Sequence, residues 1–338
     1  MKYIQLLGLL LVHFFAFAQA PKERIQEGVR LHKEGKYQDA IALYKGILTE
    51  YPNDFTTHYE LAMSYMAIKD YTNSTKHCDI VIESNFEEKD LAYLLKGAML
   101  DYSGKPNEAL QVFRDGIKHN PENHRLHYSV ALTSFNQNLY GDAEKALHNA
   151  IEIDPFHASS HMLLTYVNYT LEERVKTLLS AYFFLLLEPQ GNRANQVFPM
   201  LEEMHQKGVS KEGDKNISVQ LKSNFDKDEF GTVEMFLGLS QANLLSNYKN
   251  KTDYELFAER GNLLFSILGD QKKDKTGFYW NFYVDFYKQL TKEIYLKQVF
   301  FNRIYTFKNL EENISWLNKH DSDVEKFFFW LENFKFKC

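Results

Sequence analysis

Prolines recur at a fixed interval along the first half of this chain. Pro121, Pro155 and Pro189 are each 34 residues apart, and Pro52 lies one residue from the place two further intervals upstream. A proline ends a helix because it lacks the backbone N–H that the next turn needs. Each of these prolines follows a run whose apolar residues have helical spacing. The sequence therefore predicts a helix-turn-helix unit that repeats about every 34 residues.

The stretch from Lys33 to Asp54, KEGKYQDAIALYKGILTEYPND, is the clearest copy of the second half of this unit. Related stretches follow at 102–123 and 138–157, and a weaker copy without proline lies at 69–88. Low glycine (16) and proline (7) counts also favour helices joined by short connections. Five units are predicted, at 21–54, 55–89, 90–123, 124–157 and 158–191.

Small residues at the eighth and twentieth positions and a proline at the thirty-second make this unit similar to the tetratricopeptide repeat (TPR). Small residues let the first helix of a unit, helix A, approach the second, helix B, closely. Large residues of helix B are expected to fill the space between hairpins. The small positions hold Gly28, Ala62, Gly97 and Ala131 on helix A and Ala40, Ala109 and Ala143 on helix B, and the large positions hold Tyr44, Phe113 and Leu147.

The fifth unit departs from this pattern. Thr165 and Thr177 occupy its small positions, and its helix B, at 178–186, is almost entirely apolar. We expect this helix to be buried by the part of the chain that follows it. The resemblance implies an all-α fold, a right-handed TPR-type solenoid of helical hairpins, with a helical C-terminal cap region.

In TPR proteins helix A lines the concave face, so positions 2, 5, 9 and 12 of each unit indicate candidate binding residues. This stripe is apolar and aromatic, with few charges, and it includes Ile25, Val29, Ala98 and Leu132. Ile25 and Val29 stand where some family members hold a peptide carboxylate, so that mode is not expected. The same stripe could instead pack helix A or be covered by the second half. The candidates are His32, Tyr59, Met63, Met66, Leu94, Asp101, Arg125, Tyr128, Phe135, Met162, Tyr166 and Tyr169.

Residues 192–338 are predicted to form a second helical region, possible degenerate repeats plus a cap, with a polar linker or loop at 209–216. Two segments, 277–287 and 326–336, are dense in aromatic residues. Such side chains bury large areas, so we expect them to pack on each other and on the apolar helix of the fifth unit. The alternative is a platform that stacks sugar rings or docks a partner. Expected helices lie at 230–247, 252–269, 278–292, 294–307, 309–319 and 321–335.

The first residues have the pattern of a secretory leader. A positive start at Lys2 precedes an apolar run at 4–17, and Ala16 and Ala18 provide a small-x-small cleavage site before Gln19. We therefore predict a signal peptide at 1–18 and an exported protein, periplasmic or secreted, in a Gram-negative bacterial envelope. An uncleaved membrane anchor is the alternative. Of the two cysteines, Cys78 and Cys338, the first occupies an inward helical position and is expected to be a small buried hydrophobe rather than a disulfide partner.

No motif for catalysis is present, and no cofactor or metal is expected. A net charge of −6 gives no electrostatic reason to expect nucleic acid. Histidines recur at the fourth position of the unit, as His58, His127 and His161, where a bulky packing residue is usual, so we interpret them as structural. The sequence predicts a non-enzymatic scaffold or assembly factor that binds a protein or peptide. The alternatives are a glycan-binding envelope protein that uses its aromatic segments, or an enzyme within 192–338.

Overall fold

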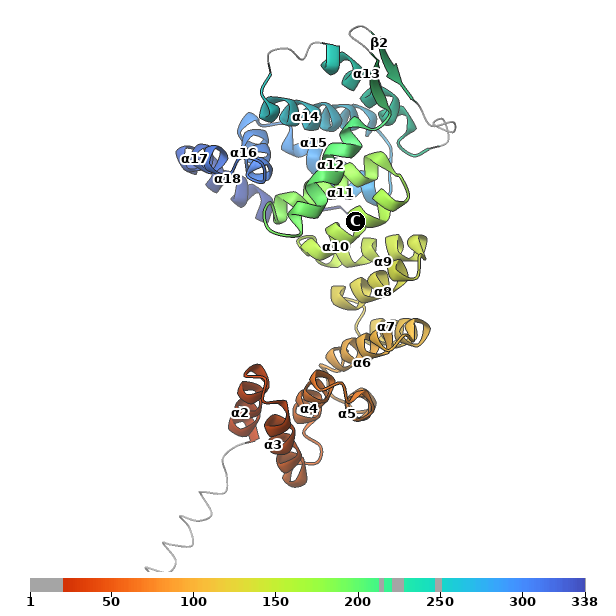
Figure 1. Ribbon diagram of the computed structural model, residues 1–338, viewed down its shortest axis with the longest axis vertical. Helices are drawn as coiled ribbons and strands as arrows, with labels where there is room; N and C mark the ends of the chain where they lie inside the picture. Colours follow the sequence, from red (N-terminus) through yellow and green to blue (C-terminus); the bar gives the residue numbers. More distant parts are fainter. Residues whose placement is uncertain (1–20, 213–215, 221–227, 247–250, 338) are drawn as a thin grey trace, which may run out of the picture. The chain divides into compact units, whose positions relative to one another are not determined.

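A computed structural model describes residues 21–212, 216–220, 228–246 and 251–337 (Figure 1). The predicted signal peptide at 1–18 and Cys338 lie outside the described residues. Within them the chain is an all-α solenoid of helical hairpins with one two-stranded sheet, so the predicted fold class is confirmed. The chain divides into two compact units, Met1–Gln137 (unit 1) and Asn138–Cys338 (unit 2), and each is described by itself.

Unit 1 consists of three helical hairpins and one further helix. Helices α2 and α3, α4 and α5, and α6 and α7 pack as pairs, and α8 packs on α7 and α6. The turn inside each hairpin contains one residue with positive φ, namely Gly35 (77°), Lys69 (63°) and Gly104 (75°). These residues share one position of the repeat, so each turn has the same left-handed backbone. The helices are α2 (Pro21–Lys33), α3 (Tyr37–Glu50), α4 (Phe55–Ala67), α5 (Tyr71–Glu83), α6 (Asp90–Tyr102), α7 (Pro106–His119) and α8 (His124–Asn136).

The expected pairing of small with large residues is present in unit 1. A Cβ atom added at Gly28 would lie 2.3 Å from the ring of Tyr44, and one added at Gly97 would lie 2.2 Å from the ring of Phe113. Both rings are buried. Helix A can therefore approach helix B only because glycine leaves room for an aromatic ring. Cys78 is free and fully buried, which confirms its interpretation as a small core residue.

Unit 2 begins with the second helix of the predicted fourth repeat and continues to the end of the described chain. Helix α11 lies at its centre, in contact with α10, α12, α13, α16 and η1. Its elements are α9 (Tyr140–Ile153), α10 (Ala158–Thr170), α11 (Arg174–Leu187), α12 (Ala194–Gln206), β1 (Val209–Glu212), β2 (Asn216–Val219), α13 (Gly231–Ser246), α14 (Asp253–Gln271), the π-helical η1 (Trp280–Val284), α15 (Asp285–Leu290), α16 (Ile294–Tyr305), α17 (Leu310–Lys319) and α18 (Asp321–Glu332).

The aromatic segments of the C-terminal region cover α11. Phe183 of α11 packs against Phe282 and Phe286, with ring centroids 5.5 Å and 5.0 Å apart, and against Phe336 at 5.8 Å. Tyr182 contacts the ring of Phe265 at 5.2 Å. The prediction that both segments pack on the fifth unit's apolar helix is therefore confirmed. The platform interpretation is wrong for 277–287, because most of its rings are buried.

Two features of unit 2 differ from the sequence prediction. The stretch 209–216 is predicted as a linker or loop, but its described residues, 209–212 and 216, belong to an antiparallel pair of strands in which Val209 pairs with Val219. The polar stretch 209–216 gave no signal for a strand, because most of the pairing strand lies beyond it and both strands pack on α13. In addition, α12 packs on α11 and α10 in the manner of another helix A, although no 34-residue signal continues past Pro189. Within the described residues, no helix is both long and apolar enough to span a membrane.

Candidate functional site

The helix-A face of unit 1 consists of the predicted binding residues on α2, α4, α6 and α8. None of these side chains is fully buried in the structure. Arg125 is exposed, and the others are half-buried. Within unit 1 this face is therefore partly accessible to a binding partner. That it binds one stays a prediction. The half-buried members are His32, Tyr59, Met63, Met66, Leu94, Asp101, Tyr128 and Phe135.

The apolar members of this face have two roles at once. Tyr59, Met63 and Met66 of α4 pack against the core between the second and third hairpins, while part of each side chain stays accessible. Leu132 of α8 is 38% exposed. The two interpretations drawn from the sequence, self-packing and an accessible apolar surface, therefore both apply to the same residues.

Polar members of the face connect successive A helices. The Nδ1 atom of His32 lies 3.0 Å from Oγ of Ser64, which joins α2 to α4. The hydroxyl of Thr133 donates to Asp101 Oδ2 at 3.0 Å, which joins α8 to α6. Burial lowers the pKa of His32, so its ring stays neutral at pH 7. These contacts hold the spacing of the A helices and leave their apolar neighbours to form the surface.

One unopposed charge stands on this face. Arg125 is exposed, and no ion pair among the described residues includes it. Burial is the largest influence on Tyr59 and raises its pKa, while the positive charge of Arg125 acts in the opposite direction. Arg125 therefore lies close enough to the middle of the face for its field to reach Tyr59. A partner's carboxylate would be attracted to this position.

The three remaining candidates lie in unit 2, on α10. Met162, Tyr166 and Tyr169 are half-buried. The Tyr166 hydroxyl donates to Gln196 Oε1 at 2.5 Å, and the Tyr169 hydroxyl donates to Glu203 Oε2 at 2.6 Å. Both acceptors belong to α12, and Glu203 lies 34 residues after Tyr169, which is one repeat length. These two tyrosines therefore hold α12 against α10, a role that the sequence pattern did not indicate.

The repeated histidines are structural, as the sequence predicted. In His58, His127 and His161 the Nε2 atom lies 2.9 Å from the carbonyl oxygen of the proline six residues earlier. A carbonyl only accepts, so each Nε2 carries the hydrogen. The Nδ1 atom of His161 then accepts from the hydroxyl of Tyr283 at 2.7 Å. Both nitrogens of His161 are therefore engaged, and the described residues contain no cluster of three metal-ligating side chains.

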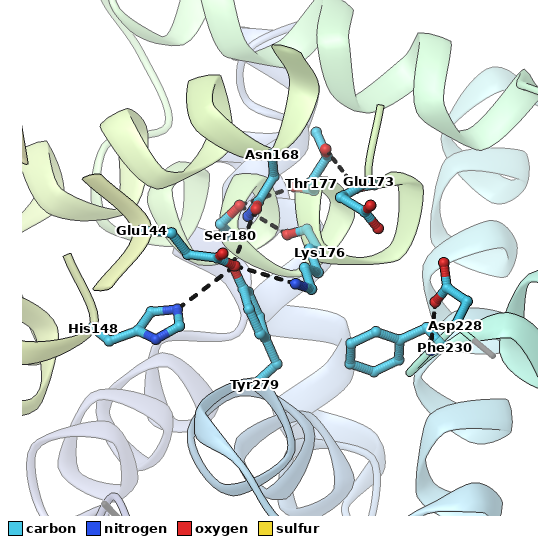
Figure 2. Close-up of polar contacts among 10 residues, drawn as sticks. All are labelled: Glu144, His148, Asn168, Glu173, Lys176, Thr177, Ser180, Asp228, Phe230 and Tyr279. Atoms are coloured by element: carbon cyan, nitrogen blue, oxygen red, sulfur yellow. Dashed lines mark hydrogen bonds and ion pairs between the residues drawn. The ribbon is translucent and has the colours of Figure 1, made fainter. Parts of the chain in front are cut away.

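A polar junction around the buried Tyr279 attaches the C-terminal region of unit 2 to its repeat helices (Figure 2). The Tyr279 hydroxyl lies 2.8 Å from Glu144 Oε1 and 3.0 Å from Asn168 Oδ1. The Lys176 ammonium lies 3.2 Å from the same Glu144 oxygen and over the Tyr279 ring. The ring of His148 stacks on Phe278. Helices α9, α10 and α11 therefore all contact the C-terminal region at one residue, Tyr279.

The charges of this junction neutralise one another. Burial by itself would raise the pKa of Glu144, but Lys176 and the Tyr279 hydroxyl together hold it below its usual value. Burial lowers the pKa of His148 to about 4. Glu144 is consequently ionised and His148 neutral at pH 7. Because Glu144, Lys176 and Tyr279 bind one another, we interpret the junction as a structural fastening rather than a reaction centre.

Comparison with known proteins supports the repeat assignment. Residues 95–164 match the sequence model of the tetratricopeptide repeat family. Together with the hairpins and their small-to-large packing, this match shows that the chain contains tetratricopeptide repeats. Proteins built from this repeat generally act as protein–protein interaction scaffolds and are typically non-catalytic.

Among curated proteins, the BBSome complex member BBS4 of Bos taurus is 22% identical over 121 residues. That alignment covers 36% of this chain and 23% of the bovine protein, so the chain spans less than a quarter of that relative.

Solved structures with a similar fold include other repeat proteins. YrrB, described as a TPR protein with an unusual peptide-binding site, is 18% identical with a TM-score of 0.42, over 52% of this chain and 90% of YrrB. TTC0263, a thermophilic TPR protein of Thermus thermophilus, is 18% identical with a TM-score of 0.44, over 54% and 100%. MamA of Desulfovibrio magneticus RS-1 is 19% identical with a TM-score of 0.42, over 55% and 97%.

Proposed function

We propose that this protein is a non-enzymatic scaffold that binds a protein or peptide partner on the helix-A face of unit 1. The observation that carries the proposal is the exposure of this face. Tyrosine, methionine and leucine side chains of successive A helices remain in part accessible, although apolar surface of this kind gains free energy when it is covered. The repeat class, whose members generally bind proteins, supports the same conclusion.

The chemistry of the face indicates what the partner presents. Methionine side chains adapt to differently shaped apolar groups, so Met63 and Met66 suit apolar anchors of a peptide. Arg125 adds one positive charge. The expected partner segment is therefore an extended peptide or an amphipathic helix with apolar anchors and a carboxylate that reaches Arg125.

A matched pair of variants tests this proposal. Leu132→Glu places a charge on the face at a residue that is 38% exposed, and Leu139→Glu makes the same change at a residue that is 44% exposed and precedes α9. Peptides selected from a display library on the wild-type chain should lose binding at least tenfold to Leu132→Glu and keep it with Leu139→Glu. Equal binding to both variants would exclude the helix-A face.

We also propose that the chain is exported and acts as an assembly or scaffolding factor in the envelope of a Gram-negative bacterium. The support is the leader pattern of residues 1–18, with its small residues before Gln19. Intact mass measurement of the protein recovered from an expressing bacterium tests this proposal. The expected mature chain begins at Gln19, and a chain that retains residues 1–18 would contradict cleavage.

A second candidate function is glycan binding at the C-terminal aromatic segment. Phe329 of α18 is 69% exposed, and a surface hollow of about 530 Å³ is lined by Tyr295, Phe329 and Trp330 together with Lys326. Exposed aromatic rings stack on sugars, so this hollow favours the platform interpretation for 326–336. Binding of the wild-type chain on a glycan array that is lost in Phe329→Ala would support glycan binding at this hollow. No binding of the wild-type chain to any glycan on the array would exclude it.

A further inference from the structure

A second polar cluster of unit 2 lies around His205, near the end of α12, and is separate from the helix-A face. The His205 side chain is 2% exposed. Its Nε2 atom lies 2.8 Å from the hydroxyl of Tyr182 on α11. Its Nδ1 atom is buried and has no hydrogen-bond partner among the described residues. Leaving a buried polar atom unbonded costs about 1–3 kcal/mol. A ligand that forms a hydrogen bond with Nδ1 would remove this cost.

The hydrogen-bond pattern fixes which nitrogen of His205 carries the hydrogen. Tyr182 is fully buried, and His205 Nε2 is the partner of its hydroxyl within the described chain. The hydroxyl donates to Nε2, since its hydrogen would otherwise be unbonded. Burial, reinforced by the charges of Arg174 and Arg260, lowers the pKa of His205 and keeps its ring neutral. The hydrogen of the neutral ring therefore lies on Nδ1, which is a donor.

Arg260 on α14 supplies a second unused donor. Its Nε atom is buried and has no hydrogen-bond partner among the described residues. Arg260 and His205 line the same cavity, of about 220 Å³, with further walls from α12, α14 and Tyr305 of α16. Two residues from different helices thus line one cavity, and each carries a buried N–H group without a hydrogen-bond partner among the described residues.

The remaining walls leave these two donors available. Glu202 lines the cavity but is paired with Lys308 at 3.0 Å. Asp253, the first residue of α14, also lines it and is exposed to solvent. The buried side chain of Phe257 provides an apolar wall. An apolar wall strengthens hydrogen bonds to a charged acceptor because it excludes water.

We propose that this cavity binds a compact oxyanion, a carboxylate or phosphate group, which accepts hydrogen bonds from His205 Nδ1–H and Arg260 Nε–H. The guanidinium group suits planar or tetrahedral oxyanions because its N–H groups form a rigid fork. The small volume admits a ligand of few heavy atoms or the terminal group of a larger one. This site is independent of the proposed function, because none of its residues belongs to the helix-A face.

Nuclear magnetic resonance of the full chain labelled with ¹⁵N-histidine tests this proposal. The chain is titrated with sodium phosphate and, separately, with sodium acetate at constant ionic strength, while the His205 ring resonances are followed. A saturable shift with at least one anion is expected, and the anion that gives it identifies the group. Arg260→Met should weaken the affinity at least tenfold. Arg114→Met, which removes an exposed guanidinium from α7, should leave it unchanged.

Two results would overturn the site. No saturable shift with either anion would mean that water alone satisfies His205 Nδ1. Equal titration curves for the wild type, Arg260→Met and Arg114→Met would mean that the anion binds elsewhere. Arg260→Lys keeps the positive charge but loses the forked N–H groups of the guanidinium, so it should also weaken anion binding. This variant replaces Arg260→Met in the test if Arg260→Met does not fold. Circular dichroism establishes that each variant is folded.

Discussion

The Nε2 atom of His161 lies 2.9 Å from the carbonyl oxygen of Pro155, and the same contact recurs at His58 and His127 with the proline six residues earlier. In each repeat the proline ends helix B and the histidine lies in the first turn of the next helix A. The contact therefore fixes the turn between one hairpin and the next. At this position of the repeat the family usually has a bulky packing residue, and here the residue is a histidine that donates a hydrogen bond.

Removal of one such donor should destabilise unit 1. His127→Ala leaves the Pro121 carbonyl without this bond and removes a nearly buried ring. We expect a loss of about 1–3 kcal/mol in the free energy of unfolding, measured by urea denaturation. His119→Ala, at an exposed histidine, should change it by less than about 0.5 kcal/mol. Equal effects of the two substitutions would contradict the role given to His127.

The buried histidines also predict a dependence of stability on pH. Burial lowers the pKa of His161 to about 3 and that of His148 to about 4, whereas a histidine in the unfolded chain titrates near 6.5. As the pH falls below 6.5, the unfolded chain binds protons that the folded chain does not. Stability should therefore decrease with falling pH, by up to about 1.4 kcal/mol per pH unit for each histidine.

This dependence can be measured between pH 7 and pH 5, above the range in which most carboxylates titrate. Urea midpoints should decline steadily over that interval for the wild type. His161→Gln, which can still donate to Pro155, should decline less steeply. A wild-type midpoint that is constant from pH 7 to pH 5 would show that these histidines are not held neutral in the folded chain.

The close approach of helix A and helix B predicts opposite effects for two glycine substitutions. Gly97→Ala would place its Cβ atom 2.2 Å from the ring of Phe113, so the ring or the helix must move. Overpacking of this kind costs about 1–3 kcal/mol. Gly141→Ala, on α9, meets nothing within 4 Å and should be neutral or stabilise by up to about 1 kcal/mol. Thermal midpoints distinguish the two, and a stabilising Gly97→Ala would refute the packing.

The junction in Figure 2 predicts the effect of removing one hydroxyl group. Tyr279→Phe takes a donor from Glu144 and a neighbour from Asn168, and it leaves Lys176 as the remaining close partner of the Glu144 carboxylate. We expect the free energy of unfolding, measured by urea denaturation, to fall by about 1–3 kcal/mol, because a partly buried carboxylate loses a hydrogen bond. Tyr102→Phe, at a residue that is 75% exposed, is the control and should leave the free energy of unfolding unchanged.

The repeat could be predicted because its signals are local and periodic. Gly28 and Gly97 stand at the small positions, Tyr44 and Phe113 at the large ones, and the structure pairs them as expected. Even the departure in the fifth unit has a local reason. The hydroxyl of Thr165 donates to the carbonyl of the residue four positions earlier, so it fits the small position without an unbonded polar group.

The features that escaped prediction depend on contacts between distant parts of the chain. Tyr279 reaches Glu144 over 135 positions and Asn168 over 111, and no local pattern marks such partners. Helix α9, which carries Glu144, belongs to unit 2, although the repeat pattern assigns it to the same hairpin as α8. The donors at His205 and Arg260 were missed for the same reason, since they come from α12 and α14. The sequence marked Tyr166 and Tyr169 as binding candidates of helix A, but it gave no sign of their hydrogen bonds to α12.

Photo-crosslinking from two matched positions tests the central claim most directly, that a partner binds the helix-A face. Benzoylphenylalanine replaces either Arg125 on α8 or Arg114 on α7, both exposed arginines. After irradiation in the producing cells, a defined adduct should form from position 125 and be absent from position 114. An adduct from 114 alone, or none from either position, would contradict a scaffold that binds its partner through helix A.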